Sequence, residues 1–391
     1  MASPSAALVK NTQQPSIQFI DLQKQQAKIR SSLEKRILGV LDHGKYIMGP
    51  EVKEFEAKLS QYCGVKHSIA CSNGTDALAL GLRAFDVGPG DAVFVPSFTF
   101  AATAEVVTWF GATPVFVDIH ADTFNIDTAN LLEAIETAKK KGLNPKGIIP
   151  VDLFGQPADY DSIEKIAGDH NLWIIADAAQ SFGGTYKGRK AGSIGHIATT
   201  SFFPAKPLGC YGDGGAVFTN DDELAAKIQS MRVHGKGSDK YDNVRIGMNA
   251  RLDTMQAAIL LEKLAIFDQE LSARQSLADK YNAAFKDICI VPTVMDQATS
   301  SWAQYTLVFA DRAERDMVAE QLKTQGVPTN IYYVKPLHQQ TAYNSYPTAS
   351  DAPLPVCEDL AGRVLSLPMS GYVDEDQSDY IIESLLKIMA K

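Results

Sequence analysis

One lysine lies on a stretch whose sequence restricts the backbone on both sides. Pro204 precedes Lys206 by two residues and Pro207 follows it directly, so we expect the lysine on a stiff, non-helical loop. A lysine held on such a loop can act as a nucleophile that forms a Schiff base with a carbonyl group. Taken alone, the segment fits an ordinary loop lysine better. Its chemistry therefore depends on the residues that the fold brings to it.

A second segment has the features of an anion-binding turn. Ser72 ends an apolar stretch, and Asn73, Gly74 and Thr75 follow it before a helical pattern that starts at Asp76. Free backbone N–H groups at a helix N-terminus favour a phosphate, and Thr75 adds a hydroxyl. An ordinary turn with a capping residue remains the simpler explanation of this segment alone. The chain has no GxGxxG pattern, which disfavours a dinucleotide-dependent dehydrogenase.

Two further residues stand where a parallel sheet would present them to a ligand. Asp177 ends the apolar run 173–177, and a buried carboxylate there needs a cationic or hydrogen-bonding partner. A protonated pyridine nitrogen is one such partner, but a helix-capping role is equally consistent with the residue alone. Phe100 follows the apolar run 92–96 and offers a ring that can stack on a flat cofactor, although aromatic residues more often pack in a core.

The elements that must position these residues alternate between strands and helices. Such alternation predicts an α/β fold with a mostly parallel sheet that is covered by helices on both faces. Ligands of these sheets bind beyond the carboxyl ends of the strands, where several polar residues fall. We expect strands at 68–72, 92–96, 114–118, 147–152, 173–177 and 197–203, with helices at 76–83, 100–110, 127–141, 162–170 and 222–233.

The two ends of the chain extend this core. Residues 1–16 are polar and predict a flexible tail, and apolar spacing predicts helices over 26–41 and 52–62. A long helix is expected over 251–271, with a helical pattern that continues to 285. We therefore predict a large domain at 17–270 and a small α/β domain at 271–391. The latter has an expected strand at 302–309, a helix at 311–325 that begins with a capping aspartate, and a closing helix at 376–389.

Composition excludes several classes of protein. The chain has 391 residues, a hydrophobic fraction of 45% and a formal net charge of -9, which argues against nucleic acid as a partner. Its five cysteines are scattered without a CxxC pair, so neither a zinc site nor a disulfide framework is indicated, and a cytoplasmic location is predicted. No stretch approaches the apolar length of a membrane span, and no metal is predicted.

Five motifs together resemble a known family. The motifs SNGTDAL, PSFTFAATAE, DAAQSFG, SFFPAKPLGCYGDGGA and GMNARLDTMQAAIL, in this order, are similar to those of the DegT/DnrJ/EryC1/StrS family of pyridoxal-phosphate-dependent sugar aminotransferases. The resemblance extends from about residue 17 to the C-terminus. It implies the aspartate aminotransferase-like fold (fold type I), a homodimer with shared active sites, and pyridoxal 5'-phosphate (PLP) as the cofactor.

The resemblance also implies roles around the ring of the cofactor. Lys206 would form the Schiff base with PLP and, once freed by the amino donor, would move the α-proton. Asp177 would pair with the pyridinium nitrogen and keep it protonated, which strengthens the electron sink. Gln180 would hydrogen-bond the ring hydroxyl, and Phe100 matches the aromatic residue that stacks on the ring.

Four other matched positions concern the phosphate of the cofactor. Gly74 and Thr75 would bind it through backbone groups, and the hydroxyls of Thr75 and Ser201 would complete the site. Asn249, in the segment 247–251, matches a residue that family members send into the phosphate site of the partner subunit. The expected kinetics are ping-pong, with L-glutamate as the amino donor and a keto nucleotide sugar as the acceptor.

The sugar is predicted from a closer resemblance. The segment from 201 and the helix from 251 look most like the branch that aminates UDP-2-acetamido-2-deoxy-3-oxo-D-glucuronate in bacterial surface-polysaccharide (O-antigen and lipopolysaccharide) pathways. Arg251, Tyr332 and His338 are the predicted substrate-binding residues, whereas we expect Arg232 and Lys335 to be solvated surface charges. The alternatives are an aminotransferase for a dTDP-keto-deoxyhexose at C-3 or C-4, and a non-catalytic PLP-binding regulatory relative.

Overall fold

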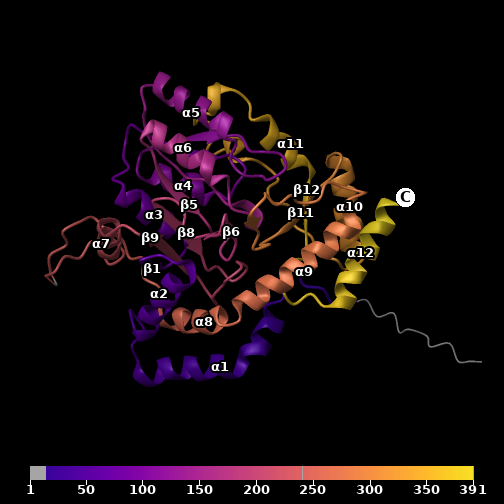
Figure 1. The fold of residues 1–391 in the computed structure, drawn as a ribbon, viewed down its shortest axis with the longest axis horizontal. Helices are drawn as coiled ribbons and strands as arrows, with labels where there is room; N and C mark the ends of the chain where they lie inside the picture. Colours follow the sequence, from indigo (N-terminus) through magenta and orange to yellow (C-terminus); the bar gives the residue numbers. More distant parts are fainter. Residues whose placement is uncertain (1–14, 240, 391) are drawn as a thin grey trace, which may run out of the picture.

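The structure is a computed structural model that describes residues 15–239 and 241–390, so most of the predicted tail at 1–16 lies outside the described residues. Its central sheet has the strand order β1-β9-β8-β5-β4-β2-β3 (Figure 1). All neighbouring strands are parallel except that β9 is antiparallel to β1 and β8. The strands are β1 (His67–Cys71), β2 (Asp91–Pro96), β3 (Thr113–Val117), β4 (Asn144–Ile148), β5 (Trp173–Asp177), β8 (Ile197–Ser201) and β9 (Gly215–Thr219).

Helices cover the sheet as the alternating pattern predicted. In Figure 1, α5 and α6 lie at the top of the molecule, and α8 and α1 lie below the sheet. Helix ends follow local chemistry: Pro50 begins α2, and the Asp127 carboxylate caps α5 by accepting from the N–H of Ala129 over 2.8 Å. The helices are α1 (Leu22–His43), α2 (Pro50–Cys63), α3 (Gly74–Ala84), α4 (Ala102–Trp109), α5 (Thr128–Lys140), α6 (Tyr160–His170), α7 (Asp222–Met231) and α8 (Thr254–Leu264).

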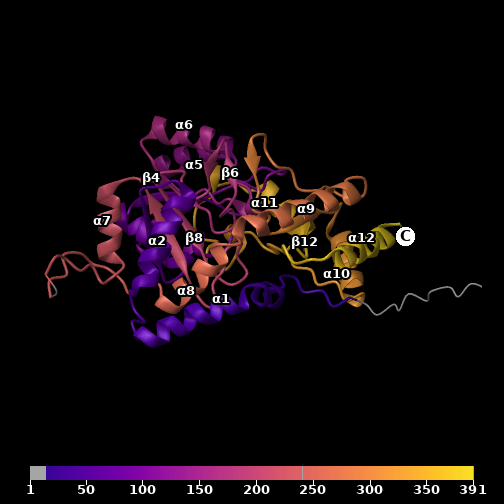
Figure 2. The same cartoon turned by 60° about the horizontal axis from the view of Figure 1, so that its bottom comes forward.

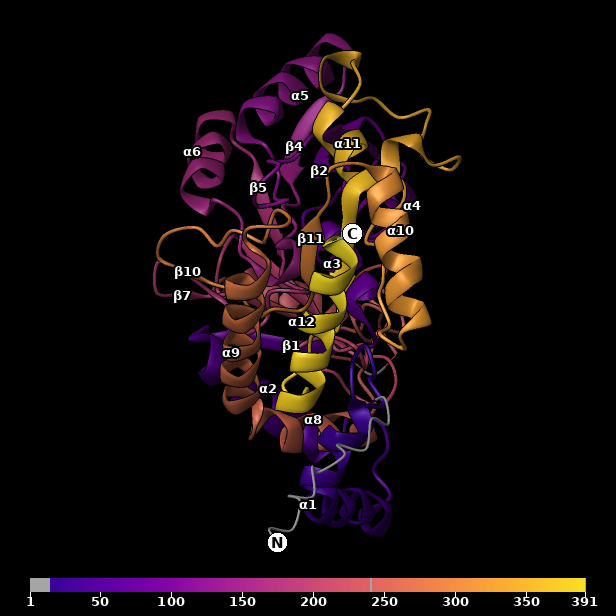
Figure 3. The same ribbon diagram turned by 90° about the vertical axis from the view of Figure 1, so that its right-hand side faces the viewer.

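A second, smaller group of elements follows α8. The strands β11 and β12 form an antiparallel pair, and Figure 3 shows α9, α12 and α10 side by side on this part of the molecule. Asp311 caps α10, as predicted, by accepting from the N–H of Glu314 over 2.9 Å. The elements are α9 (Phe267–Phe285), β11 (Tyr305–Val308), α10 (Arg312–Thr324), α11 (Pro355–Arg363), β12 (Val364–Leu367) and α12 (Glu375–Met389), and a minor sheet has β6 (Thr185–Tyr186), β7 (Arg189–Lys190) and β10 (Ala298–Thr299).

Buried apolar side chains form two separate groups. The larger group surrounds the central sheet, and the smaller one joins α9, β11, α10, β12 and α12. The two groups do not strictly follow the order of the chain, because Ile17 packs in the smaller group and Leu337 and Leu360 pack in the larger. The division into 17–270 and 271–391 stays a prediction. No helix of the described residues is long and apolar enough to cross a membrane.

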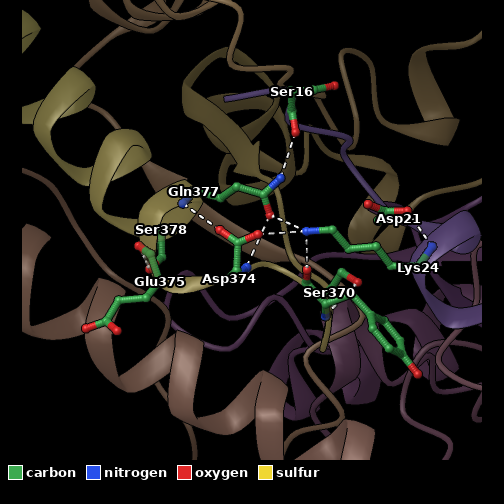
Figure 4. A network of polar contacts seen from close by, with 9 residues as sticks. Ser16, Asp21, Lys24, Ser370, Asp374, Glu375, Gln377 and Ser378 are labelled. Carbon is green, nitrogen blue, oxygen red and sulfur yellow. Dashed lines mark hydrogen bonds and ion pairs between the residues drawn. The ribbon is translucent and has the colours of Figure 1, made fainter. Parts of the chain in front are cut away.

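A polar network attaches the start of α1 to the smaller group (Figure 4). The Lys24 ammonium donates to the Asp374 carboxylate over 2.8 Å, to Gln377 Oε1 over 3.0 Å and to the carbonyl of Tyr372 over 3.2 Å. Gln377 in turn donates to the carbonyl of Ser16 over 2.6 Å. The ion pair between Lys24 and Asp374 is partly exposed, so it adds little to the free energy of unfolding and mainly positions the chain.

The prediction of one helix over 251–271 is wrong. The chain forms two helices, and Ile266 between them departs from helical geometry with φ -110° and ψ 1°. Leu261 before the break and Phe267 after it are both buried in the same core. Apolar periodicity therefore continues across the break, and spacing alone could not report it.

The predicted strand at 147–152 is also displaced. β4 occupies Asn144–Ile148, and beyond it only Val151 forms an isolated bridge, with Asp177. Pro150 has no N–H to donate, so the hydrogen-bond ladder cannot continue through it.

Candidate active site

Sheet register brings three of the predicted site residues to one edge. Asp177 ends β5, and Ser201 ends the neighbouring parallel strand β8. Ser201 pairs with Gly215 at the start of the antiparallel β9, and Gly215 also pairs with Cys71 at the end of β1. α3 begins with Gly74, three residues after Cys71. Asp177, Ser201 and Gly74 therefore lie at the carboxyl edge of the parallel strands, where such sheets bind ligands.

The backbone at this edge is packed too closely for side chains. A Cβ on Gly74 would lie 2.7 Å from Cβ of Ser201, and a Cβ on Gly215 would lie 2.3 Å from the carbonyl oxygen of Asn73. The Asn73 side chain caps α3, and the N–H groups of Gly74 and Thr75 lie at the free end of the helix. With the hydroxyls of Thr75 and Ser201 nearby, this is a cradle that suits a phosphate.

Lys206 and Asp177 form the charged pair of the site. Lys206 lies on a turn after β8, where its N–H donates to the carbonyl of Phe203 over 2.8 Å. Burial lowers the pKa of the Lys206 amine, and the charge of Asp177 opposes that shift. An amine whose neutral form is favoured in this way is suited to attack a carbonyl group.

The environment of Asp177 favours a positively charged partner. Its side chain is only 7% exposed, and burial raises the pKa of its carboxyl group. The N–H of Ala179 donates to its Oδ1 over 3.1 Å, and the charge of Lys206 also favours the ionised form. The segment after Asp177 is a turn and not a helix, so helix capping does not explain this residue. A protonated ring nitrogen would hold the carboxylate ionised.

Gln180 is held by two contacts. Its Oε1 accepts from the N–H of Phe154 over 2.7 Å, and its Nε2 donates to the hydroxyl of Tyr333 over 3.5 Å. The structure thus adds Tyr333 to the site, a residue that the sequence analysis missed in favour of its neighbour Tyr332. Two adjacent tyrosines were the only signal, and spacing did not show which one faces Asp177 and Gln180.

The two remaining cofactor candidates are exposed in the single chain. Phe100, just beyond β2, is 58% exposed, which leaves its ring free to meet a ligand. Asn249 is also exposed and lies at the base of an arm, residues 234–239 and 241–249, that follows α7 and projects from the body in both Figure 1 and Figure 2. The bridge between Val233 and Asn249 closes that base.

The predicted substrate residues have different surroundings. Arg251 is half-buried just before α8, and the ring of Tyr332 packs edge-on against Phe19 at 6.4 Å. His338 is clamped, because Nδ1 lies 2.7 Å from the Ser97 hydroxyl and Nε2 lies 3.1 Å from the Glu358 carboxylate. With both ring nitrogens engaged, His338 holds the loop after β2 in place.

Of the two expected surface charges, one is not at the surface. Arg232 is 5% exposed and forms an ion pair with Glu56 and a 2.7 Å hydrogen bond to the carbonyl of Ala70. Its side chain therefore points inward from the end of α7 to the carbonyl of Ala70 in β1. Lys335 is exposed, as predicted.

Comparison with known proteins decides the family. The sequence pattern of the DegT/DnrJ/EryC1/StrS aminotransferase family matches residues 27–386. The chain belongs to this family. It is similar to the UDP-2-acetamido-2-deoxy-3-oxo-D-glucuronate aminotransferase of Pseudomonas aeruginosa, with 48% identity over 359 residues, which are 92% of this chain and 96% of that one. A pleiotropic regulatory protein of Geobacillus stearothermophilus is 42% identical over 375 residues, 95% of this chain and 98% of that one.

Solved structures of the family have the same fold. A DegT/DnrJ/EryC1/StrS aminotransferase from Brucella abortus is 54% identical with a TM-score of 0.94, over 96% of this chain and all of that one. DesV of S. venezuelae, solved with a ketimine intermediate, is 36% identical with a TM-score of 0.90, over 96% of this chain and 99% of that one. The PLP form of a Streptococcus pneumoniae member has a TM-score of 0.83 at 28% identity, over 92% of this chain and 96% of that one. The predicted fold type I architecture, the aminotransferase activity and the PLP cofactor are confirmed.

The residues of this family member fit PLP. The buried carboxylate of Asp177 suits the ring nitrogen, the amine of Lys206 suits the aldehyde carbon, and the cradle at Gly74 and Ser201 suits the phosphate. When bound, PLP supplies an electron sink for the charge that develops at the α-carbon of the amino donor.

The close approach of Gly74 to Ser201 gives a testable consequence. Gly74→Ala places a methyl group 2.7 Å from the Ser201 side chain, so the cradle must widen. We expect the dissociation constant of PLP to rise about tenfold or more in the variant, which corresponds to a loss of binding free energy of about 1.4 kcal/mol or more. Equilibrium dialysis followed by the visible absorbance of the cofactor measures this. The matched control is Gly88→Ala, which meets nothing within 4 Å. Equal retention by both variants would remove Gly74 from the phosphate site.

Proposed function

We propose that this aminotransferase transfers the amino group of L-glutamate to the 3-oxo carbon of UDP-2-acetamido-2-deoxy-3-oxo-D-glucuronate. The observation that carries the proposal is the 48% identity to the Pseudomonas aeruginosa enzyme named for that sugar. A dTDP-3-amino-3,4,6-trideoxy-alpha-D-glucose transaminase of Streptomyces venezuelae is less similar, at 37%. The product would be a 3-amino uronate sugar nucleotide for a bacterial surface polysaccharide.

Lys206 is the proposed catalytic base. Its amine, whose neutral form is favoured by burial, would hold the cofactor through a covalent link. When free, the same amine would take the proton from the α-carbon of the amino donor. A positioned base of this kind contributes about 10²–10⁴-fold in rate.

The other residues of the site hold the cofactor in place. Asp177 keeps a positive charge on the ring nitrogen, and Gln180 donates its remaining amide N–H to the ring hydroxyl. Phe100 covers the ring, and Thr75 and Ser201 donate their hydroxyls to the phosphate. Fixed charges and donors in a site that excludes water need no reorganisation during the reaction, which is the main source of their effect on rate.

The substrate adds a carboxylate and a diphosphate, both of which need cationic or polar partners. Arg251 is the proposed partner of one of these anionic groups, because it lies between Asn249 and the start of α8. Tyr332 is proposed to contact the sugar. His338 is proposed to shape the pocket through Ser97, because both of its ring nitrogens are already engaged.

A homodimer with shared active sites is part of the proposal. The arm at 234–239 and 241–249 exposes apolar side chains to solvent in the single chain, including Val244 at 52% and Ile246 at 75%. A partner subunit would cover them and receive Asn249 at its phosphate site.

Asn249→Ala tests the shared site. Loss of one hydrogen bond to a charged phosphate costs about 1.5–3 kcal/mol, so PLP should dissociate roughly ten- to a hundredfold more readily. The measurement is cofactor retention on dialysis, with Asp242→Ala on the same arm as the control. Retention equal to that of the control would mean that Asn249 does not contact the phosphate.

A second candidate function rests on one relative. The 42% identity to a pleiotropic regulatory protein supports a second proposal, PLP binding without turnover. A single experiment separates the two candidate functions. Addition of glutamate should change the visible absorbance of a catalytic holoenzyme and leave that of a non-catalytic PLP-binding protein unchanged.

The choice of sugar is tested with a panel of keto sugar nucleotides. We expect kcat/KM to be highest for the UDP-3-oxo-uronate, lower for its counterpart without the carboxylate, and lowest for dTDP-keto-deoxyhexoses. A preference for a dTDP sugar would replace the proposed substrate and leave the proposed chemistry intact.

A further inference from the structure

A buried cluster of charged groups lies where α1, α8 and α9 meet the glycine-rich loop at 207–214, which follows Lys206. Its cations are Lys263 of α8 and Arg274 of α9, which are 1% and 6% exposed, and its carboxylate is Glu270, which is 3% exposed. Gln25 Nε2 and the Tyr372 hydroxyl both donate to the same oxygen of Glu270, over 2.7 and 2.5 Å. Two cations thus face one carboxylate, and burying an uncompensated charge is costly.

Several polar atoms of this cluster lack a partner. Among the described residues, no hydrogen bond reaches the Lys263 ammonium, Nε and Nη1 of Arg274, the Tyr211 hydroxyl or Oε1 of Gln25. All of these atoms are shielded from solvent. Four of the five are able to donate, so the group that would satisfy them is an acceptor.

These groups are close enough to influence one another. The Lys263 ammonium lies 4.8 Å from the ring centroid of Tyr211. Burial is the main cause that lowers the pKa of Lys263 to about 8; Arg274 contributes to the lowering, and Glu270 and Cys210 oppose it. Burial likewise lowers the pKa of Arg274, with Glu270 and Tyr372 opposing. The two cations therefore repel each other, and the charge of Glu270 offsets this repulsion only in part.

We propose that this cluster binds one small monovalent inorganic anion of the halide class, held by Lys263, Arg274 and the Tyr211 hydroxyl. The charge follows from the excess of one cation over the single carboxylate. The size follows from enclosure, because the cationic side chains are almost fully buried. The anion accepts hydrogen bonds from donors that otherwise have none, and it relieves the repulsion between the two cations.

The anion would join three parts of the fold. Tyr211 belongs to the loop behind Lys206, and its backbone N–H donates to Gln256 Oε1 of α8 over 2.9 Å. The Tyr372 hydroxyl donates to Glu270, and the backbone carbonyl of the same residue accepts from the Lys24 ammonium. Lys24 belongs to the network that holds the start of α1 (Figure 4). The proposed site therefore stabilises the junction between α8, α9 and the loop.

Thermal unfolding of the holoenzyme in bromide tests the proposal. Sodium bromide is titrated at constant sodium concentration against sodium gluconate, whose anion is too large for an enclosed site. The melting midpoint should rise with bromide and saturate, as binding at one site requires. Lys263→Met, which keeps the buried length and removes the charge, should abolish the rise. Lys165→Met, an exposed lysine paired with Asp169, should keep it.

A second measurement stands on the wild-type protein alone. Crystals grown in sodium bromide should show an anomalous peak between the Lys263 ammonium and the Arg274 guanidinium. Bromide peaks only elsewhere, or an equal bromide response in Lys263→Met, would overturn the proposal and leave a neutral lysine or water in its place. Neither outcome bears on the aminotransferase activity.

Discussion

Replacement of Lys206 with alanine is expected to abolish the covalent link to PLP and to lower kcat by about 10²–10⁴-fold or more. The variant has neither the amine that attacks the cofactor nor the base that moves the α-proton. The measurement is the visible absorbance of the purified variant with added PLP, followed by the rate of amino transfer from glutamate.

Lys206→Arg separates the charge from the chemistry. Arginine keeps a cation beside Asp177, but its guanidinium stays protonated and is no nucleophile. We expect this variant to be as inactive as Lys206→Ala. Near-normal turnover by either variant would contradict the assignment of Lys206, and a loss of activity in Lys165→Ala would point to a general effect of lysine substitution.

Asp177→Asn should have the second largest effect. The amide cannot hold a positive charge on the ring nitrogen, and removal of one such electrostatic partner costs about 10²–10³-fold in kcat. The substitution should also move the titration of Lys206. Because the charge of Asp177 raises the pKa of Lys206 against the effect of burial, its removal should lower that pKa further. The pH at which the apoprotein reacts half-maximally with PLP should then fall.

Stability distinguishes this effect from misfolding. Burial raises the pKa of Asp177, so near neutral pH its ionised form destabilises the fold, and asparagine should leave the melting midpoint of the apoprotein unchanged or higher. A variant with a clearly lowered midpoint, or one with unchanged kcat, would contradict the proposed role.

Much of the fold could be predicted from the sequence because local signals and burial agree there. The strand β5 is a continuous apolar run that ends in Asp177, and β1 is followed directly by the helical pattern of α3. The failures arose where one pattern serves two elements. The apolar pattern continues from α8 into α9, so it gave no sign of the break at Ile266. Pro150 interrupts the hydrogen-bond ladder, so β4 ends earlier than its apolar sequence suggested.

The residues of the site were predictable where a motif names them, and less so where only packing places them. Gly74, Asp177 and Ser201 come together at the carboxyl edge of the parallel strands, where the sequence analysis expected a ligand to bind. Tyr333 reaches Gln180 from a segment 153 residues away, and no spacing rule connects them. Arg232 was expected at the surface because its burial depends on Glu56, a partner that is distant in sequence.

We propose that this chain moves an amino group to a keto nucleotide sugar by way of Lys206. The direct measurement supplies the holoenzyme with glutamate labelled at nitrogen and with UDP-2-acetamido-2-deoxy-3-oxo-D-glucuronate, and reads the mass of the sugar product. We predict a 3-amino product that carries the label with the wild-type enzyme and none with Lys206→Ala. If the wild-type enzyme transferred no label to any keto nucleotide sugar of the panel, the proposed reaction would be contradicted.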